Sequence, residues 1–358
     1  MKAGRIKYIM EEFVLCSDCF FDQGLKLDSF YLGIDNNNNI CPNCKSEKGK
    51  KLDKNILMEL ADRFFVRGTI IKTEYGAYSA VQFNEHQNTS IEVSEWLKND
   101  VALIEKILKM GFFHYGPRLW MIGEVEPLKS LQNILERKDM IKRIIKEYPE
   151  KLIKSGEIFY RLRKEPQEPS KFYEYDSPPD EFCGTGRLDS KVLPILYGSQ
   201  DFEICIHECR VTIEDELYIA TLSPTRDLKL LDLTELLNEE NTEFESLDIA
   251  VHMLFLEGNH SYEISRDIAL DVFDSGYDGI IYPSYFSLVK TGARPLETVY
   301  GISIRKVPSE KNYAKSQVIQ NIALFGRPIK NEDVSVKCIN RLVLNTVNYN
   351  VQFGPVEY

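Results

Sequence analysis

The sequence lacks any long apolar run. None of its 358 residues lies in a stretch approaching the roughly 18 consecutive apolar positions that a membrane-spanning helix needs. The first residues do not resemble a secretory signal either, because charged side chains such as Arg5, Glu11 and Glu12 interrupt them before an apolar core can form. Together these absences predict a cytoplasmic protein with no membrane segment.

An excess of positive charge is also absent. The sequence has 44 Lys and Arg against 55 Asp and Glu, a net charge of −11, which argues against general nucleic-acid binding. The imbalance is confined to one part of the chain: residues 1–150 carry 22 basic and 22 acidic side chains, whereas residues 151–358 carry 22 and 33. In a chain long enough for two domains, this asymmetry predicts the domains 1–150 and 151–358.

Cysteine follows the clearest pattern. Without a secretory signal, the eight cysteines are not expected to form a disulfide framework. Four of them form two C-x2-C pairs separated by 21 residues: Cys16, Cys19, Cys41 and Cys44. A turn of this spacing directs two thiolates at one ion, and two such turns complete a tetrahedral S4 site that suits structural Zn²⁺, or iron. The alternative is four reduced thiols in a loop.

The rest of residues 1–150 has helical periodicity. Apolar residues recur at helical spacing over 52–66, Ser94 is a candidate N-cap for a helix reaching residue 110, and a third helical run covers 128–148. The histidines of this part, His86 and His114, lack the upstream Arg of the Arg–His motif in helical nucleases of the HEPN type. We therefore predict a small, mostly helical domain that regulates or recognises a partner.

Residues 151–358 mix strand and helix patterns. Residues 158–163 and 193–197 read as strands, and the Pro-rich segment 165–181 between them reads as a surface loop. Ser199 is a candidate N-cap for a helix of about 12 residues, with Glu208 beside its apolar face. A carboxylate in that place is costly unless it is paired or used in function, and periodicity does not separate these alternatives.

Later segments add one candidate and two acidic stretches. Residues 276–284 read as a turn and a buried strand that ends at Ser284, and residues 336–353 predict two strands joined near Asn345. The turn at 214–216 superficially resembles the Glu-x-Glu of protein ADP-ribosyltransferases, but a solvated acidic turn is the simpler interpretation. The acidic run 232–248 is expected to be a solvated helix face.

In their order and spacing, these motifs resemble the RES domain family over about residues 155–353. The series is Tyr160-Arg161, Gly186-Arg187, Leu196-Tyr197, Glu208 and Tyr282-Pro283-Ser284. The family is named for an Arg, a Glu and a Ser, which Arg161, Glu208 and Ser284 match. The paired cysteines, followed by residues 52–68, are similar to the HEPN-related N-terminal region of some longer RES proteins.

The resemblance implies an α+β protein, in which an ADP-ribosyltransferase-like RES domain follows the small zinc-binding, helical domain. It implies a bacterial toxin or defence effector that takes NAD⁺ as substrate and cleaves the nicotinamide–ribose bond by hydrolysis or phosphorolysis. The alternatives are a mono-ADP-ribosyltransferase that modifies a protein or nucleic acid, and a binding module without activity. An antitoxin or other regulatory protein is the implied partner, and a homo-oligomer stays open.

The charged residues of the series suit this chemistry. Arg161 and Arg187 are candidates for the pyrophosphate, because guanidinium groups bind phosphate oxygens bidentately. Glu208 would stabilise the positive charge that develops on the ribose as the glycosidic bond breaks. Ser284 would hydrogen-bond the ribose or the carboxamide.

The two tyrosines complete the candidate site. Tyr160 and Tyr197 would offer aromatic faces and hydroxyl groups to the nicotinamide or the ribose. Nicotinamide is a cationic leaving group, so neither a general acid nor a catalytic metal is required. Taken singly, each residue of the series has an equally simple interpretation in packing or in a turn; the prediction rests on the ordered set.

Overall fold

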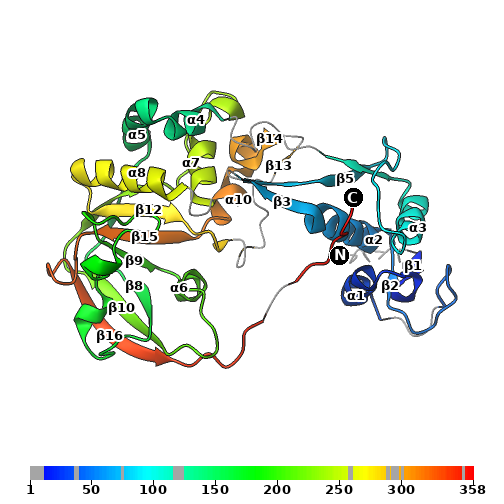
Figure 1. The fold of residues 1–358 in the computed structure, drawn as a ribbon, viewed down its shortest axis with the longest axis horizontal. Coiled ribbons are helices and arrows are strands. Elements are labelled where there is room, and N and C mark those ends of the chain that lie inside the picture. The colour runs from blue at the N-terminus through cyan, green and yellow to red at the C-terminus, as the bar shows by residue number, and fades with distance from the viewer. Residues whose placement is uncertain are drawn as a thin grey trace, which may run out of the picture. The chain divides into compact units, whose positions relative to one another are not determined.

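The computed structural model describes most of the chain in two compact units (Figure 1). The described residues are 12–35, 40–73, 76–115, 125–256, 261–287, 291, 298–299, 302–348 and 351–358. One unit, which we call the cysteine unit, contains residues 12–72, 77–115 and 351–358 of these. The other, the sheet unit, contains Thr73, Gly76 and the described residues from 125 to 348. Within the described ranges, no helix has the length and apolar character to cross a membrane.

This division differs from the boundary expected after residue 150. Helices α4 (Glu126–Gln132) and α5 (Ile134–Glu147) belong to the sheet unit. The reason is the apolar face of each helix: Leu128, Ile141 and Ile144 are buried in the core of the sheet unit. The third predicted helical run is thus two helices, separated at Asn133, whose side chain caps α5.

The cysteine unit combines helices with short strands. Its helices are α1 (Gln23–Leu32), α2 (Lys54–Ala61) and α3 (Lys98–Leu108). Its strand pairs are β1 (Leu15–Cys16) with β2 (Lys51–Leu52), β3 (Ile70–Thr73) with β4 (Gly76–Ser79), and β5 (Val81–Asn84) with β6 (Gly111–His114). The helix predicted over 52–66 is present as α2 and the π-helical turn Asp62–Val66 that continues it. The strands make this unit less helical than expected.

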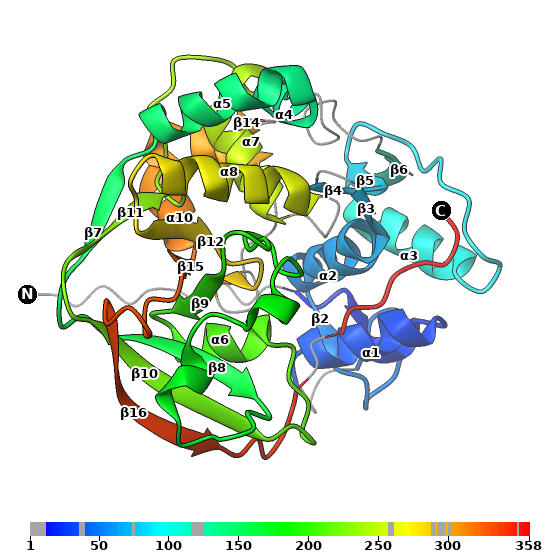
Figure 2. The ribbon, with the colours of Figure 1, turned by 60° about the vertical axis from the view of Figure 1, so that its left-hand side comes forward.

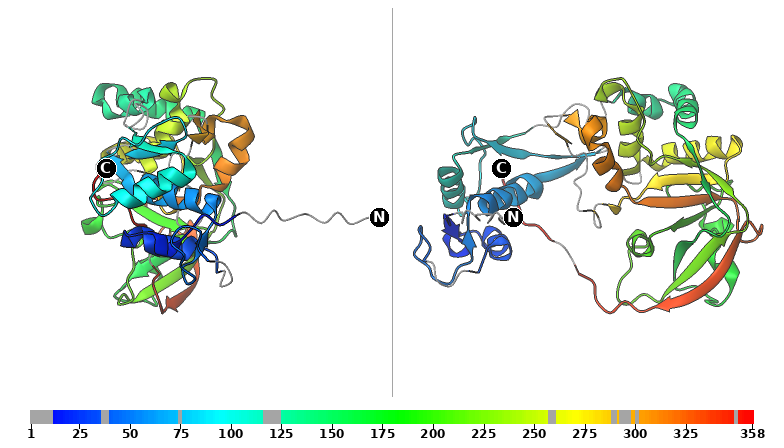
Figure 3. Two further views of the ribbon diagram at one scale, coloured as in Figure 1. Left: turned by 90° about the vertical axis from the view of Figure 1, so that its right-hand side faces the viewer. Right: turned by 180° about the vertical axis from the view of Figure 1, so that it is seen from behind.

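The last residues of the chain pack into the cysteine unit. Figures 2 and 3 show this tail, coloured red, running along the helices of that unit. The carbonyl group of Phe353 and the backbone of Gly354 lie against Gly68, and Tyr358 packs on the apolar core of the unit. Ser94 was expected to cap a helix, but α3 starts only at Lys98 and the Ser94 hydroxyl instead donates a hydrogen bond to Glu357 at 3.0 Å.

We expect Gly68→Ala to detach this tail. A Cβ atom at position 68 would lie 2.5 Å from the Phe353 carbonyl oxygen and 2.6 Å from the Gly354 Cα, and backbone atoms cannot yield as a flexible side chain does. The expected cost is about 1–3 kcal/mol of unfolding free energy, typical of overpacking. Hydrogen exchange should show faster exchange in 351–358, with the exposed Ser90→Ala as the control; unchanged exchange would contradict the packing.

An eight-stranded sheet forms the centre of the sheet unit. In spatial order the strands are β16 (Val334–Leu342), β10 (Leu217–Pro224), β8 (Phe159–Lys164), β9 (Ile195–Ser199), β15 (Gln320–Phe325), β12 (Gly279–Pro283), β11 (Leu228–Asp232) and β7 (Glu150–Ile153). All neighbouring strands are antiparallel except β11 and β12. Helices and mainly antiparallel strands in one unit confirm the α+β prediction.

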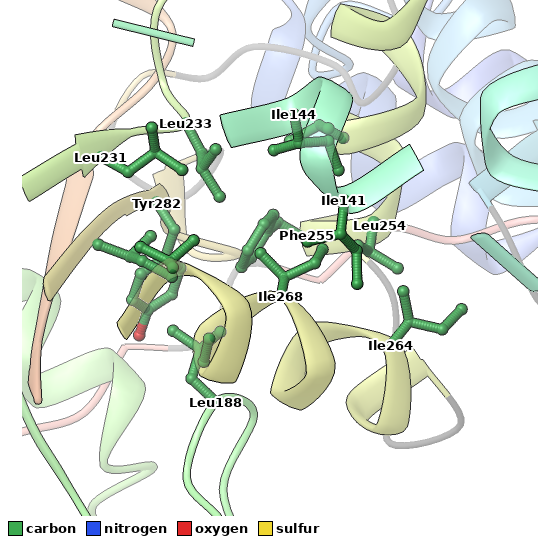
Figure 4. Packing of buried hydrophobic residues seen from close by; sticks show 14 of the residues in the cluster. Ile141, Ile144, Leu188, Leu231, Leu233, Leu254, Phe255, Ile264, Ile268 and Tyr282 are labelled. Carbon is green, nitrogen blue, oxygen red and sulfur yellow. The ribbon is translucent and has the colours of Figure 1, made fainter. Parts of the chain in front are cut away.

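Helices α7 (Leu247–Leu256) and α8 (Tyr262–Asp274) cover one face of this sheet. Strand alternation assigns the faces: Ile280 and Tyr282 of β12 join the core under these helices, whereas Ile281 joins the core on the opposite face. Figure 4 shows the helix-covered core. Its labelled members include Ile141, Ile144, Leu231, Leu254, Phe255, Ile264, Ile268 and Tyr282.

The same face continues across β9 and β8. Tyr197 is paired with Ala323 of the helix-covered core, and Tyr160 is paired with Ser199, so these side chains point to that face. Helix α6 (Phe202–Glu208) packs there against β8 (Figure 2). It is shorter than predicted and is capped by Asp201 rather than Ser199.

Two other expectations need correction. The tail forms the single strand β16 and then crosses to the cysteine unit, so two strands joined near Asn345 are wrong. The acidic run is not a solvated helix face, because Asp232 ends β11 and is 1% exposed. Asp248 is also buried, in α7, where it forms an ion pair with Arg305 at 2.7 Å.

Candidate functional site

Glu208 lies at the C-terminal end of α6, on the helix-covered face of the sheet. The buried side chains of Ile204 and Cys205 hold the helix on β8, and the Cys205 thiol donates to the Tyr160 carbonyl oxygen at 3.3 Å. Glu208 itself is exposed. A carboxylate at this end of a helix meets the negative end of the helix dipole, so its position must be stabilised by other groups.

Two buried side chains supply that stabilisation. The Ser284 hydroxyl and the Asn321 amide each donate a hydrogen bond to Glu208 Oε1, at 2.6 Å in both cases. Ser284 follows β12 directly, and its hydroxyl oxygen accepts the Phe286 N–H at 3.1 Å. The structure therefore brings together two of the predicted residues, Glu208 and Ser284, although 76 positions separate them.

Tyr282 is buried on β12, two residues before Ser284. Its ring packs on Phe255, with 5.3 Å between centroids (Figure 4). Burial, and after it the negative charge of Glu208, raises the pKa of the Tyr282 phenol well above its ordinary value. The phenol therefore stays neutral at physiological pH and adds no second negative charge near Glu208.

Tyr197 is on the predicted face, but its hydroxyl group already makes hydrogen bonds within the protein. It accepts the N–H groups of Leu188 and Asp189, at 2.9 and 3.0 Å, and donates to the Asp189 carboxylate at 3.0 Å. A phenolic hydroxyl has one proton and two acceptor positions, so these bonds satisfy it. Asp189 in turn accepts the N–H groups of Gly184 and Thr185. Tyr197 thus fixes the loop that carries Arg187.

We expect Tyr197→Phe to loosen this loop. The substitution leaves two N–H groups without their acceptor, which costs about 1–3 kcal/mol of unfolding free energy when such groups are buried. Urea unfolding should show this loss, and Tyr173→Phe, at an exposed tyrosine of the same unit, should not. An unchanged Tyr197→Phe would mean that the hydroxyl does not hold the loop.

Arg187 lies against the helices that cover the sheet. Its guanidinium group is 4.8 Å from the Tyr262 ring centroid and 5.7 Å from that of Phe255, and Nη1 donates to the Leu254 carbonyl oxygen at 3.1 Å. Arg266 binds the Gly186 carbonyl oxygen through two nitrogens. The loop 184–189 is thus bound both by Tyr197 of the sheet and by Arg266 of α8.

Arg161 is not on the same face as Glu208. Tyr160 and Leu162, its neighbours in β8, face α6. The Arg161 side chain therefore points to the opposite face, where Phe159 belongs to the other apolar core. Its guanidinium group is buried and donates to the carbonyl oxygens of Asp176 and Tyr197, at 2.9 Å each. In this arrangement Arg161 ties the loop before β9 to the sheet. Tyr160 faces α6 and meets Phe202 edge-on, with 6.2 Å between centroids.

Sequence reasoning missed Asn321 and Asp189, whose contacts depend on strand register and loop path. The rival acidic turn is exposed at Glu214 and Glu216, on a loop between α6 and β10, as expected of a solvated turn. In the sequence, Asn321 stands two residues before Ala323 in a segment with a strand pattern, so the two side chains are expected on the same face of the sheet. That pattern predicts the face but gives no indication of a contact with Glu208.

The paired cysteines come together in the cysteine unit. Their four Sγ atoms all lie within 4.8 Å of one another, with 3.4 Å between Cys16 and Cys44 and 3.5 Å between Cys19 and Cys41. Zn–S bonds of about 2.3 Å in a tetrahedron place sulfurs roughly 3.8 Å apart, so the donor set fits Zn²⁺. Burial raises the pKa of the Cys19 thiol to about 11, so a bound metal would displace protons from these thiols.

Comparison with known proteins identifies the second unit. The family model of the RES domain matches residues 158–293, a segment that begins at the start of β8 and contains Glu208 and Ser284. The chain contains a RES domain. The resemblance inferred from the motifs is confirmed, while Asn321 lies beyond the matched residues of this RES domain.

Two further comparisons are less informative. A chain from the crystal structure of the M.tuberculosis MbcT-MbcA toxin-antitoxin complex is 14% identical, with a TM-score of 0.30. The match covers 57% of the present chain and 91% of that chain. We draw no conclusion about function from a likeness of this size. No curated protein matches.

Proposed function

We propose that the RES domain cleaves the nicotinamide–ribose bond of NAD⁺, with water as acceptor. The observation that carries the proposal is Glu208: an exposed carboxylate, held through one oxygen by Ser284 and Asn321, on a RES domain. Among the described residues, no hydrogen bond is made to its other oxygen, Oε2. That oxygen is free to meet a ribose.

The chemistry needs a negative charge close to the ribose. As the C–N bond breaks, its electron pair leaves with nicotinamide, which becomes neutral, and positive charge develops on the ribose as an oxocarbenium ion. Glu208 stabilises that charge through Oε2. Water then adds to the anomeric carbon and loses one proton, so the products are ADP-ribose, nicotinamide and H⁺.

Other residues position the substrate. Arg187 is the candidate for the pyrophosphate, on the loop that Tyr197 and Asp189 fix. Arg161 acts on the opposite face of the sheet and holds the segment around Asp176 and Tyr197, instead of touching substrate as first expected. Tyr160 supports α6 and through it Glu208.

Purified protein incubated with NAD⁺ tests the proposal. Free nicotinamide and ADP-ribose in equal amounts would support hydrolysis, and ADP-ribose 1-phosphate formed in phosphate buffer would indicate phosphorolysis. Label from NAD⁺ retained on a protein or nucleic acid of a lysate would favour the mono-ADP-ribosyltransferase instead. If NAD⁺ stays intact in all three assays, the proposal is wrong.

We further propose that the activity works as a toxin or defence effector under the control of a partner protein. Unrestrained hydrolysis of NAD⁺ would harm the cell that makes it, so an antitoxin or a similar inhibitor is required. Expression of the wild-type chain should stop growth and deplete cellular NAD⁺, whereas the Glu208→Gln chain should do neither. Normal growth with active wild-type enzyme present would contradict this role.

A further inference from the structure

Asn321 contacts the candidate catalytic carboxylate, although no motif includes it. It lies on β15, opposite Tyr282 on one side and Ser199 on the other, and is 3% exposed. Its Nδ2 donates to Glu208 Oε1 at 2.6 Å. The register of three strands, rather than local sequence, brings this amide to the end of α6.

We propose that Asn321 is a positioning residue for the reaction: together with Ser284 it fixes Glu208 Oε1, so that Oε2 points to the ribose. This inference rests on the proposed function, because it assigns Asn321 a part in that chemistry. It adds a residue outside the matched RES segment to the site.

The hydrogen-bond directions support this role. The Ser284 oxygen accepts the Phe286 N–H, so the single hydroxyl proton is directed to Glu208. An ionised carboxylate only accepts, so the Asn321 amide must present its nitrogen to it. With both bonds on Oε1, the acceptor capacity of that oxygen is filled, and rotation of the carboxylate would break both.

A neutral amide suits this position better than a cation would. Glu208 stands at the negative end of the α6 dipole, where an unsupported carboxylate is disfavoured. A lysine or arginine in place of Asn321 would stabilise the carboxylate but also cancel the charge that the ribose needs. The amide favours the ionised form by hydrogen bonding and leaves the charge in place.

Three variants separate positioning from packing. Asn321→Leu keeps the branching of the side chain and removes the donor, and Asn321→Asp keeps the shape. Gln320→Met is the matched control, because Gln320 is the next residue of β15, points to the other face and bonds to Thr234 and Lys151 instead of Glu208. We expect Asn321→Leu to lower kcat for nicotinamide release by about 10–100-fold with KM nearly unchanged.

The aspartate variant gives a signature in the pH profile. At neutral pH its carboxylate would repel Glu208, so its activity should fall below that of Asn321→Leu. On acidification it should recover, because a protonated aspartic acid donates to Oε1 as the amide does. If Asn321 only fills space, the aspartate variant should exceed the leucine variant at every pH.

Other titratable groups near Glu208 do not imitate this recovery. Burial raises the pKa of the Cys205 thiol to about 12 and raises the pKa of the Cys209 thiol and the Tyr282 phenol, so these groups stay neutral in acid. His207, which stacks on Phe286 with 5.8 Å between centroids, is controlled with His207→Gln. The pH profile of nicotinamide release by His207→Gln should match that of the wild type.

A measurement that does not depend on catalysis tests the role of Asn321 separately from the proposed cleavage of NAD⁺. In protein labelled with ¹³C-glutamate, the Glu208 carboxyl signal is assigned by its loss in Glu208→Gln. At neutral pH the chemical shift of this signal should change in Asn321→Leu, which loses a hydrogen bond to the carboxylate, and should stay in place in Gln320→Met. An unchanged chemical shift in Asn321→Leu overturns the role of Asn321 whatever the activity. A changed chemical shift in a protein that leaves NAD⁺ intact overturns the proposed function and the catalytic part of this inference, while the contact stands.

Discussion

Glu208→Gln is expected to lower nicotinamide release by on the order of 10²–10³-fold, the size typical of losing one preorganised electrostatic contact. Glutamine keeps the length of the side chain, and its carbonyl oxygen can still accept from Ser284 and Asn321. What it removes is the negative charge that stabilises the oxocarbenium ion. Because the contact matters chiefly in the transition state, kcat should fall while KM changes little.

A matched pair of controls sharpens this result. Glu214→Gln and Glu216→Gln remove the same charge from the exposed turn between α6 and β10. They should leave nicotinamide release within about twofold of wild type, since solvent screens charges on an exposed loop. If these variants lose activity and Glu208→Gln does not, the turn contains the catalytic carboxylate and the site has been assigned to the wrong place.

Sequence patterns predicted the parts of the site that depend on local structure. The two C-x2-C pairs define their own turns, and the structure brings the two turns together as the prediction of a metal site requires. Glu208 beside the apolar face of a helix indicated a carboxylate that needs partners, and the structure supplies Ser284 and Asn321. A helix containing Glu208 was predicted because its apolar positions are periodic, although its length and its cap were wrong.

The remaining parts depend on strand register, which no local pattern contains. Asn321 reaches Glu208 only because β15 pairs with both β12 and β9. The assignment of Arg161 could have been sharpened from the sequence, because adjacent residues of a strand face opposite sides of the sheet. Tyr160 and Arg161 therefore cannot both face one substrate, and the structure places Tyr160 on the side of α6.

The path of the chain end also escaped prediction. Residues 351–353 were predicted to end a second strand but form none, and residues 351–358 instead have partners in Gly68 and Ser94, far away in sequence. Their packing has a thermodynamic consequence. The tail lies in the same compact unit as the cysteines, so we expect whatever stabilises the cysteine cluster also to stabilise the packing of the chain end.

Removing the metal is expected to unfold the cysteine unit. Structural zinc sites contribute about 10–16 kcal/mol of apparent binding free energy, comparable to the whole stability of a small domain. The purified chain should contain about one Zn²⁺, and the double variant Cys16→Ser/Cys41→Ser should contain none. Hydrogen exchange should then lose protection in α1, α2 and the tail 351–358, while β12 and β15, in a core of their own, keep it.

Cys338→Ser is the control, because Cys338 is an exposed cysteine of β16, in the other unit. It should keep both the metal and the protection of the tail. Iron in place of zinc, or no metal in the wild type, would contradict the assignment. Loss of zinc with an unchanged tail would show that the C-terminal residues fold independently of the cluster. Exchange in the tail therefore tests two claims at once: that the cysteines bind a metal, and that this metal stabilises residues more than 300 positions away.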